Sequence, residues 1–113
     1  MSLFEKIQAA RQNKDTQAYA DLMAEDCVFV RHQSGTQMKK PEIKALLDNM
    51  LGGGGSFGKE RCIYENDDIL VVHSINDYPD GSREAVMGVY LLKDGKIARF
   101  ETGATPLPAT APA

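Results

Sequence analysis

The stretch Gly88–Phe100 has the sequence GVYLLKDGKIARF, and it decides the fold because it encodes a β-hairpin. β-Branched, aromatic and aliphatic residues stand on both sides of a Lys-Asp-Gly turn. We expect a three-residue loop with Gly95 in a left-handed conformation, which would place Gly88 opposite Phe100. The residues that would then share one face of the sheet are Val86, Gly88, Tyr90, Phe100 and Thr102.

More strands flank this hairpin. The residue types predict strands at Arg61–Glu65, Ile69–Tyr78 and Arg83–Lys93, and a last strand from Ile97 to about Ala104. Asn-Asp-Asp and Pro-Asp-Gly sequences separate the first three of these strands. The second half of the chain is therefore a run of antiparallel hairpins.

The first half of the chain is mainly helical. A capping box at Ser2 predicts a helix ending near Asn13, and Asp15 can cap a second helix that stops at 24–26. Residues 27–32 and 37–38 read as a short hairpin, and Pro41 begins a third helix that ends at Gly52. The glycine-rich run 52–56 is expected to be a flexible linker.

Helices followed by hairpins predict an α+β fold, with helices covering one face of a curved sheet. Residues 1–105 are expected to form one domain and 106–113 a disordered tail. A cavity between the helices and the sheet is the expected place for function.

Composition excludes several function classes. The chain has 113 residues, a net charge of -3 and 26% charged residues, which argues against nucleic acid as a partner. No apolar run is long enough to span a membrane, and no signal peptide is visible. Two cysteines make a poor disulfide framework, so we expect free thiols and a cytoplasmic protein that needs no cofactor.

Three segments in their order resemble the nuclear transport factor 2-like superfamily, which includes ketosteroid isomerases and SnoaL-like polyketide cyclases. They are Asn13-Lys14-Asp15, the strand entry AEDCVF at 24–29, and the hairpin Gly88–Phe100. The resemblance spans Phe4 to Leu107. It implies a cone-shaped α+β barrel with three N-terminal helices packed on a curved, mostly antiparallel sheet.

The resemblance does not extend to steroid isomerase chemistry. That activity needs a hydroxyl donor, a carboxylate base and a protonated carboxylic acid. The matching positions hold Ile7, Arg31 and Gly88, and none of these side chains can do the required work. SnoaL-like cyclases also use an acidic group near the final hairpin, where Gly88 stands.

Other residues are the candidates for a site. A four-residue loop between 78 and 83 would turn His73 into the cavity as an acid/base, while a one-residue slip would turn Ser74 and Asn76 inward instead. A hydrogen-bonded structural histidine is the alternative role for His73. Arg31 or His32 must face the interior, and Arg31 would suit a carboxylate on a ligand. The remaining candidate ligand-binding residues are aromatic: Tyr19, Phe29, Tyr64, Tyr90 and Phe100.

The sequence shows no metal-ligand spacing, so no metal site is predicted. The outer face of the sheet would carry Met87, Val89, Leu91 and Ile97, and such an apolar surface predicts a homodimer through this face. The alternative is a register error that turns these residues inward.

Three functions remain open from the sequence. The first is binding of a small, mostly apolar ligand in the cone pocket, with its polar end near Arg31 and His73. The second is an isomerase, cyclase or lyase type of enzyme with His73 as acid/base. The third is a structural or accessory dimer without catalysis.

Overall fold

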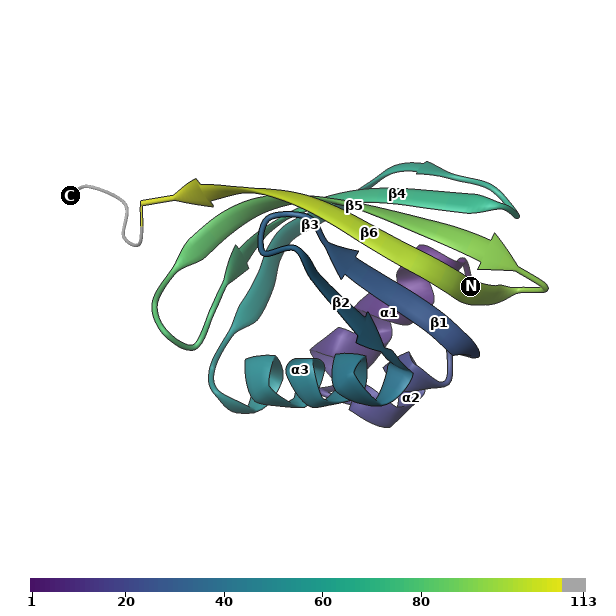
Figure 1. Cartoon of the computed structure of the whole chain (residues 1–113), viewed down its shortest axis with the longest axis horizontal. Coiled ribbons are helices and arrows are strands. Elements are labelled where there is room, and N and C mark those ends of the chain that lie inside the picture. The colour runs from purple at the N-terminus through teal and green to yellow at the C-terminus, as the bar shows by residue number, and fades with distance from the viewer. Residues whose placement is uncertain (109–113) are drawn as a thin grey trace.

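The computed structural model describes residues 1–108 and shows three helices beneath one curved sheet (Figure 1). The helices are α1 (Leu3–Gln12), α2 (Thr16–Ala20) and α3 (Lys40–Gly52). The capping box predicted at Ser2 is present, and the Asp15 side chain accepts a hydrogen bond from the backbone of Ala18. These local signals fix where both N-terminal helices begin.

Six strands form the sheet, in the order β2-β1-β6-β5-β4-β3. Neighbouring strands are antiparallel, except that β1 runs parallel to β6. The sheet curves around the helices without closing, and the predicted α+β cone architecture is confirmed (Figure 1). The strands are β1 (Met23–Arg31), β2 (Thr36–Lys39), β3 (Ser56–Glu65), β4 (Ile69–Asp77), β5 (Arg83–Lys93) and β6 (Lys96–Leu107).

The hairpin of β5 and β6 differs from its predicted register by two residues. Asp94 and Gly95, with φ of 53° and 78°, form a two-residue turn, and β6 carries a bulge close to it. Gly88 therefore lies opposite Thr102, and the prediction that it pairs with Phe100 was wrong. A shift of two residues keeps each side chain on its predicted face, because strand side chains alternate with a period of two.

The loop between β4 and β5 has one residue more than predicted. β4 ends at Asp77, which pairs with Arg83, and Tyr78 joins the loop. A change of one residue turns every side chain of a strand to the opposite face. Ser74 consequently faces the helices and His73 faces away, so the alternative register is the correct one.

Two predicted boundaries were wrong. α2 ends at Ala20 and Met23 already belongs to β1, so the second helix is shorter than its apolar pattern suggested. β6 runs to Leu107, and Pro106 pairs with Glu84 inside the predicted tail. Proline is tolerated there because β1 pairs with β6 only as far as Thr102, which leaves one edge of β6 open. Residues 109–113 of the predicted tail lie outside the described part of the chain.

The glycine-rich run after α3 is shaped by packing. A Cβ atom on Gly55 would lie 2.5 Å from the Met50 sulfur, and one on Gly53 would lie 2.9 Å from the Pro79 ring. The chain thus needs glycine for close approach at these two positions. β3 begins directly afterwards at Ser56, five residues earlier than predicted.

A buried core joins all three helices to the sheet. It includes Ile7, Tyr19, Leu47, Tyr90 and Ile97. The prediction that Ile97 faces outward was wrong, because it is only 1% exposed and its turn folds it against the helices. Within residues 1–108, no helix is both long and apolar enough to cross a membrane.

Candidate functional site

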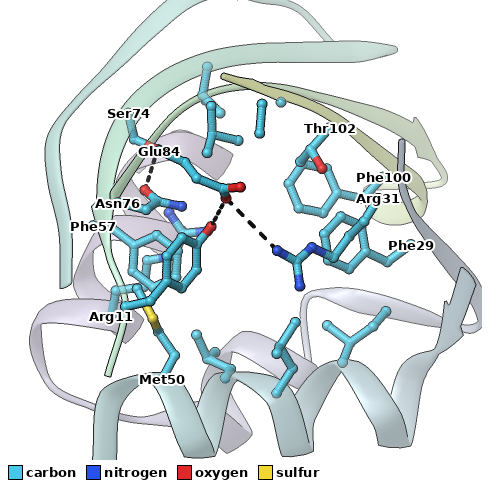
Figure 2. A pocket seen from close by; sticks show the side chains of 18 of the residues that line it. Arg11, Phe29, Arg31, Met50, Phe57, Ser74, Asn76, Glu84, Phe100 and Thr102 are labelled. Atoms are coloured by element: carbon cyan, nitrogen blue, oxygen red, sulfur yellow. Dashed lines mark hydrogen bonds and ion pairs between the residues drawn. The ribbon is translucent and has the colours of Figure 1, made fainter. Parts of the chain in front are cut away.

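A cavity of about 130 Å³ lies between α3 and the concave face of the sheet (Figure 2). Packed interiors leave few voids larger than a water molecule, so a space of this size is a candidate site. Most of its wall is apolar. The hydrophobic residues that line it include Phe29, Ile43, Leu46, Leu47, Met50, Phe57, Val72, Val86 and Phe100.

Three aromatic rings on neighbouring strands form one wall. The Phe100 ring stacks on Phe29 with centroids 4.6 Å apart and on Tyr90 with centroids 3.9 Å apart. Gly88 makes room for this stack, because a Cβ atom there would lie 2.8 Å from the Phe100 ring. Both faces of Phe100 are covered, so a ligand would meet its edge, which carries partial positive charge.

A buried ion pair closes the cavity toward α1. The Arg11 side chain from α1 pairs with Glu60 of β3, and their side chains are only 10% and 7% exposed. The guanidinium lies 3.9 Å from the centre of the Phe57 ring and hydrogen-bonds the Tyr90 hydroxyl over 3.3 Å. Tyr19 lies 3.4 Å from the same hydroxyl, and burial raises the pKa of Tyr90 well above its ordinary value. We call Arg11 and Glu60 the inner pair.

A second group of charged side chains lines the cavity where it meets a second hollow (Figure 2). Glu84 reaches in from β5 and accepts a hydrogen bond of 2.6 Å from the Tyr78 hydroxyl. Arg31 approaches from β1, with its Nη2 3.9 Å from the same carboxylate oxygen. Burial, and then the bond to Glu84, raise the pKa of Tyr78 above its ordinary value. We call Arg31, Tyr78 and Glu84 the mouth cluster.

The mouth cluster also borders a second hollow. That hollow shares Arg31, Tyr78 and Glu84 with the cavity and continues along the polar loop at 80–82. The side chains at the mouth are more exposed than the inner pair, 28% for Arg31 and 11% for Glu84. A ligand entering from this side would meet these groups first.

A short polar strip runs along the sheet beside the mouth. The Ser74 hydroxyl donates a hydrogen bond of 2.7 Å to the amide oxygen of Asn76, and both residues are buried. Thr102 lines the same cavity from β6. These groups can bind a polar substituent at the side of an otherwise apolar ligand.

The structure brings five of the predicted site residues together. Tyr19, Phe29, Arg31, Tyr90 and Phe100 all line the cavity. Their placement follows from α2 and from strands β1, β5 and β6, whose predicted faces were right.

Three other predicted site residues lie elsewhere. His73 pairs with Arg61 and Met87 on the outer face, because the β4–β5 loop is one residue longer than predicted. His32 follows the end of β1, and its Nε2 lies 2.8 Å from Glu101 in an exposed ion pair. The prediction that His73 faces the cavity was therefore wrong, and His32 does not line the cavity.

Tyr64 is the third. It is 55% exposed, and its hydroxyl accepts a hydrogen bond from Asn66. Its partner in β4 is Val71, on the outer face. Bulges interrupt β3 beside Tyr64, so its orientation does not follow from regular alternation along the strand.

Sequence reasoning missed three of the four charged residues of the cavity, namely Arg11, Glu60 and Glu84. Phe57 and Glu60 were overlooked because residues 57–60 lie between the predicted linker and the predicted strand and were assigned to neither. Tyr78 and Glu84 were overlooked because they flank a turn. Arg11 sits in the last turn of an amphipathic helix, where a basic residue ordinarily faces solvent. Only Glu84 could have been found from the sequence. It is a charged residue on the strand face that Val86, Gly88 and Tyr90 were expected to direct into the cavity.

Metal binding finds no support in the part of the chain that the structure describes, where no group of three His, Cys, Asp or Glu residues is placed to hold an ion. The two cysteines differ in burial: Cys27 is buried in β1 and Cys62 is exposed on β3. Burial raises the pKa of the Cys27 thiol, which favours its protonated form.

Comparison with known families decides the family. The model of the SnoaL-like domain matches residues 4–100, nearly the whole chain. The chain belongs to the SnoaL-like domain family. The resemblance found in the sequence is confirmed, whereas a search of curated protein sequences finds no match.

Solved structures share the SnoaL-like fold at low identity. An NTF2-like protein of unknown function from Cytophaga hutchinsonii has a TM-score of 0.73 and 13% identity, with 88% of this chain and 84% of that chain covered. A candidate ketosteroid isomerase from Kribbella flavida has a TM-score of 0.69 and 14% identity, with 96% and 79% covered. IdmH, a candidate polyketide cyclase from Streptomyces antibioticus, has a TM-score of 0.68 and 13% identity, with 88% and 87% covered. These similarities show the fold, and the fold alone does not give a function.

The positions that matched steroid isomerase chemistry have other roles in this SnoaL-like domain. Ile7 is 1% exposed in the core, and the space beside Gly88 is occupied by Phe100. Arg31 lies at the mouth beside Glu84. The two carboxylates that line this cavity are at different places, Glu84 on β5 next to the β4–β5 loop and Glu60 on β3.

Proposed function

We propose that this SnoaL-like domain binds a small, largely apolar molecule in the cavity between α3 and the sheet. The observation that carries the proposal is an unfilled space of about 130 Å³ inside an otherwise packed core, with polar groups gathered at its open end. An engineered apolar cavity of roughly 150 Å³ in another protein holds benzene, so a single ring is a suitable size for this one.

The orientation of a ligand in the cavity follows from the apolar and polar side chains that line it. Apolar and aromatic side chains surround the middle of the cavity, and the mouth cluster and the Ser74–Asn76 strip lie to one side. A ring in the middle would bury its apolar surface there, while a polar substituent would reach Glu84, Tyr78 or Arg31. The inner pair is held by its own ion pair, by the Tyr90 hydroxyl and by the Phe57 ring, although the Arg11 Nε has no hydrogen-bond partner within residues 1–108, and the pair forms part of the wall.

Filling the cavity tests this proposal. Ala104 lines the cavity and Ala85 lies on the opposite face of the neighbouring strand. Ala104→Phe places a ring in the ligand's space, whereas Ala85→Phe adds the same bulk outside it. We expect ring-sized ligands to raise the melting temperature of the native protein and of Ala85→Phe, and to have no effect on Ala104→Phe. Equal responses of all three proteins would refute binding in the cavity.

A second candidate function is catalysis. Glu84 is a carboxylate that is 8% exposed, faces an apolar cavity and has a tyrosine hydroxyl at 2.6 Å, which is the environment of many general acids and bases. We propose it in place of His73 as the acid/base of an isomerase, cyclase or lyase type of reaction. The solved structures named above include candidate enzymes of two such classes.

Two matched variants separate catalysis from binding. Turnover of any substrate that the protein converts should fall at least about a hundredfold in Glu84→Gln, a loss typical of removing a general base. His73→Gln should leave turnover unchanged, since His73 lies on the outer face. The reverse pattern, or equal losses, would exclude Glu84 as the acid/base.

We also propose that the outer face of the sheet binds a second copy of this chain. Met87 and Leu91 are 43% and 39% exposed there, and the neighbouring positions across the sheet include Val71 and Val89. Met87→Lys with Leu91→Lys should convert a dimer to a monomer in light scattering. A native protein that is already monomeric at micromolar concentration would contradict the proposal.

A further inference from the structure

The charges of the cavity cancel. Its charged lining residues are two arginines and two glutamates, and each arginine has a carboxylate partner: Arg11 pairs with Glu60 and Arg31 with Glu84. The sequence predicted that Arg31 would meet a carboxylate on the ligand. The protein supplies a carboxylate of its own from β5, 3.9 Å from the guanidinium, so a ligand carboxylate that approached Arg31 would also meet the charge of Glu84.

The carboxylate of Glu84 has one oxygen available to a ligand. Both the Tyr78 hydrogen bond and the Arg31 ion pair involve Oε1. No side-chain hydrogen bond or ion pair within residues 1–108 involves Oε2. Since an ionised carboxylate only accepts hydrogen bonds, the group that best satisfies Oε2 is a donor such as a hydroxyl.

From this geometry we infer that the ligand is a neutral ring compound carrying a hydroxyl group, with the ring between the aromatic wall and α3 and the hydroxyl donated to Glu84. The inference rests on the proposed binding function and names its ligand class. Figure 2 shows the Glu84 carboxylate reaching into the cavity opposite Arg31. Glu84 is thus the specificity-determining residue of the site.

The same geometry excludes anionic ring compounds. A ligand carboxylate beside Glu84 would place two like charges in a poorly solvated space, where the charge of Glu84 already offsets that of Arg31. Removing the charge of Glu84 reverses this situation, because Arg31 then becomes an unpaired cation that a ligand carboxylate can bind. The selectivity should therefore change from hydroxyl to carboxylate on substitution of one residue.

Titration calorimetry with three compounds of similar shape tests the inference. Benzyl alcohol carries the hydroxyl, ethylbenzene has no polar group, and benzoate is ionised at neutral pH. The native protein should bind benzyl alcohol about tenfold more tightly than ethylbenzene and at least about tenfold more tightly than benzoate, since one hydrogen bond to a charged group corresponds to roughly that ratio. Glu84→Gln should lose most of the preference for benzyl alcohol and bind benzoate about tenfold more tightly than the native protein does.

Two further variants control this experiment. Glu101→Gln removes a carboxylate from an exposed ion pair outside the cavity and should leave all three affinities unchanged. Arg31→Gln leaves Glu84 without its cation and should weaken benzoate binding further, which retains the test if Glu84→Gln does not fold.

The outcomes separate the two proposals. Native protein that binds ethylbenzene and benzoate as tightly as benzyl alcohol keeps the binding function and overturns the hydroxyl preference. An unchanged ratio of benzyl alcohol to benzoate in Glu84→Gln also overturns it. No binding of any of the three compounds overturns both the ligand class and the proposed function for ring-sized molecules.

Discussion

The inner pair and the mouth cluster contain the same chemical groups in different surroundings. The inner pair has the Tyr90 hydroxyl beside its arginine, and the mouth cluster has the Tyr78 hydroxyl beside its glutamate. The inner pair is more deeply buried, and the Phe57 ring covers its guanidinium. Arg31 and Glu84 are 3.9 Å apart and border an open hollow. The comparison teaches that burial and closeness of contact, more than residue type, separate a structural ion pair from one that a ligand can reach.

The largest difference between the two regions should be in stability. Glu60→Gln leaves Arg11 as a buried cation without its carboxylate and should lower the free energy of unfolding by about 3–5 kcal/mol. Glu84→Gln leaves Arg31 partly exposed to water and should cost about 1 kcal/mol. Urea denaturation of both variants measures this directly. Equal losses would remove the distinction between a structural pair and a binding pair.

Substitution of Gly88 tests the wall that connects the two regions. A methyl group there would meet the Phe100 ring at 2.8 Å and Val72 at 3.2 Å, so the ring must move. Gly88→Ala should lower the free energy of unfolding by about 1–3 kcal/mol, a cost typical of overpacking. Gly103→Ala is the matched control, since nothing lies within 4 Å of its Cβ position. A stabilised Gly88→Ala protein would show that the stacked wall is not tightly packed.

The tyrosine hydroxyl groups of the two regions should also differ in how much they contribute to stability. Tyr78→Phe removes a hydrogen bond of 2.6 Å to Glu84 and should cost about 1–2 kcal/mol, because bonds to charged groups are the stronger ones. Tyr19→Phe removes only a 3.4 Å contact with Tyr90 and should cost about 0.5 kcal/mol or less. Thermal unfolding of the two variants compares them. A larger loss for Tyr19→Phe would reverse the assignment of the stronger contact.

The smallest effect is expected at Glu101, which contacts Arg99 and His32 outside the cavity and belongs to neither region. Hydrogen bonds from Arg99 and then from His32 lower the pKa of Glu101 below its ordinary value. A lowered pKa in the folded state contributes stability above the ordinary glutamate pKa, and this contribution disappears as the pH falls through the lowered value. The melting temperatures of the native protein and Glu101→Gln should therefore differ slightly at neutral pH and converge in acid. A difference that widens in acid would contradict the sign.

The architecture could be predicted because its signals are local. The capping box at Ser2, the cap at Asp15 and the Asp-Gly turn each act within a few residues, and the order of helices and hairpins then limits the fold to an α+β cone. The pocket faces of β5 and β6 were also predicted, because the error in that hairpin was two residues and conserves alternation.

The details of the site could not be predicted because they depend on loop length and on bulges. One additional loop residue at Tyr78 exchanges His73 for Ser74 in the cavity. Bulges in β3 turn Glu60 inward from a segment that follows the predicted glycine linker and was assigned to no strand. Each event changes the backbone by one or two residues and depends on tertiary packing, which a single sequence does not reveal.

A crystal structure of the native protein soaked with benzyl alcohol tests the central claim most directly. The account predicts the ring in the cavity beside Phe100 and its hydroxyl oxygen within about 3 Å of Glu84, with the inner pair unchanged. A ring bound outside the cavity, or a hydroxyl directed to the inner pair while Glu84 keeps only its protein contacts, would contradict it.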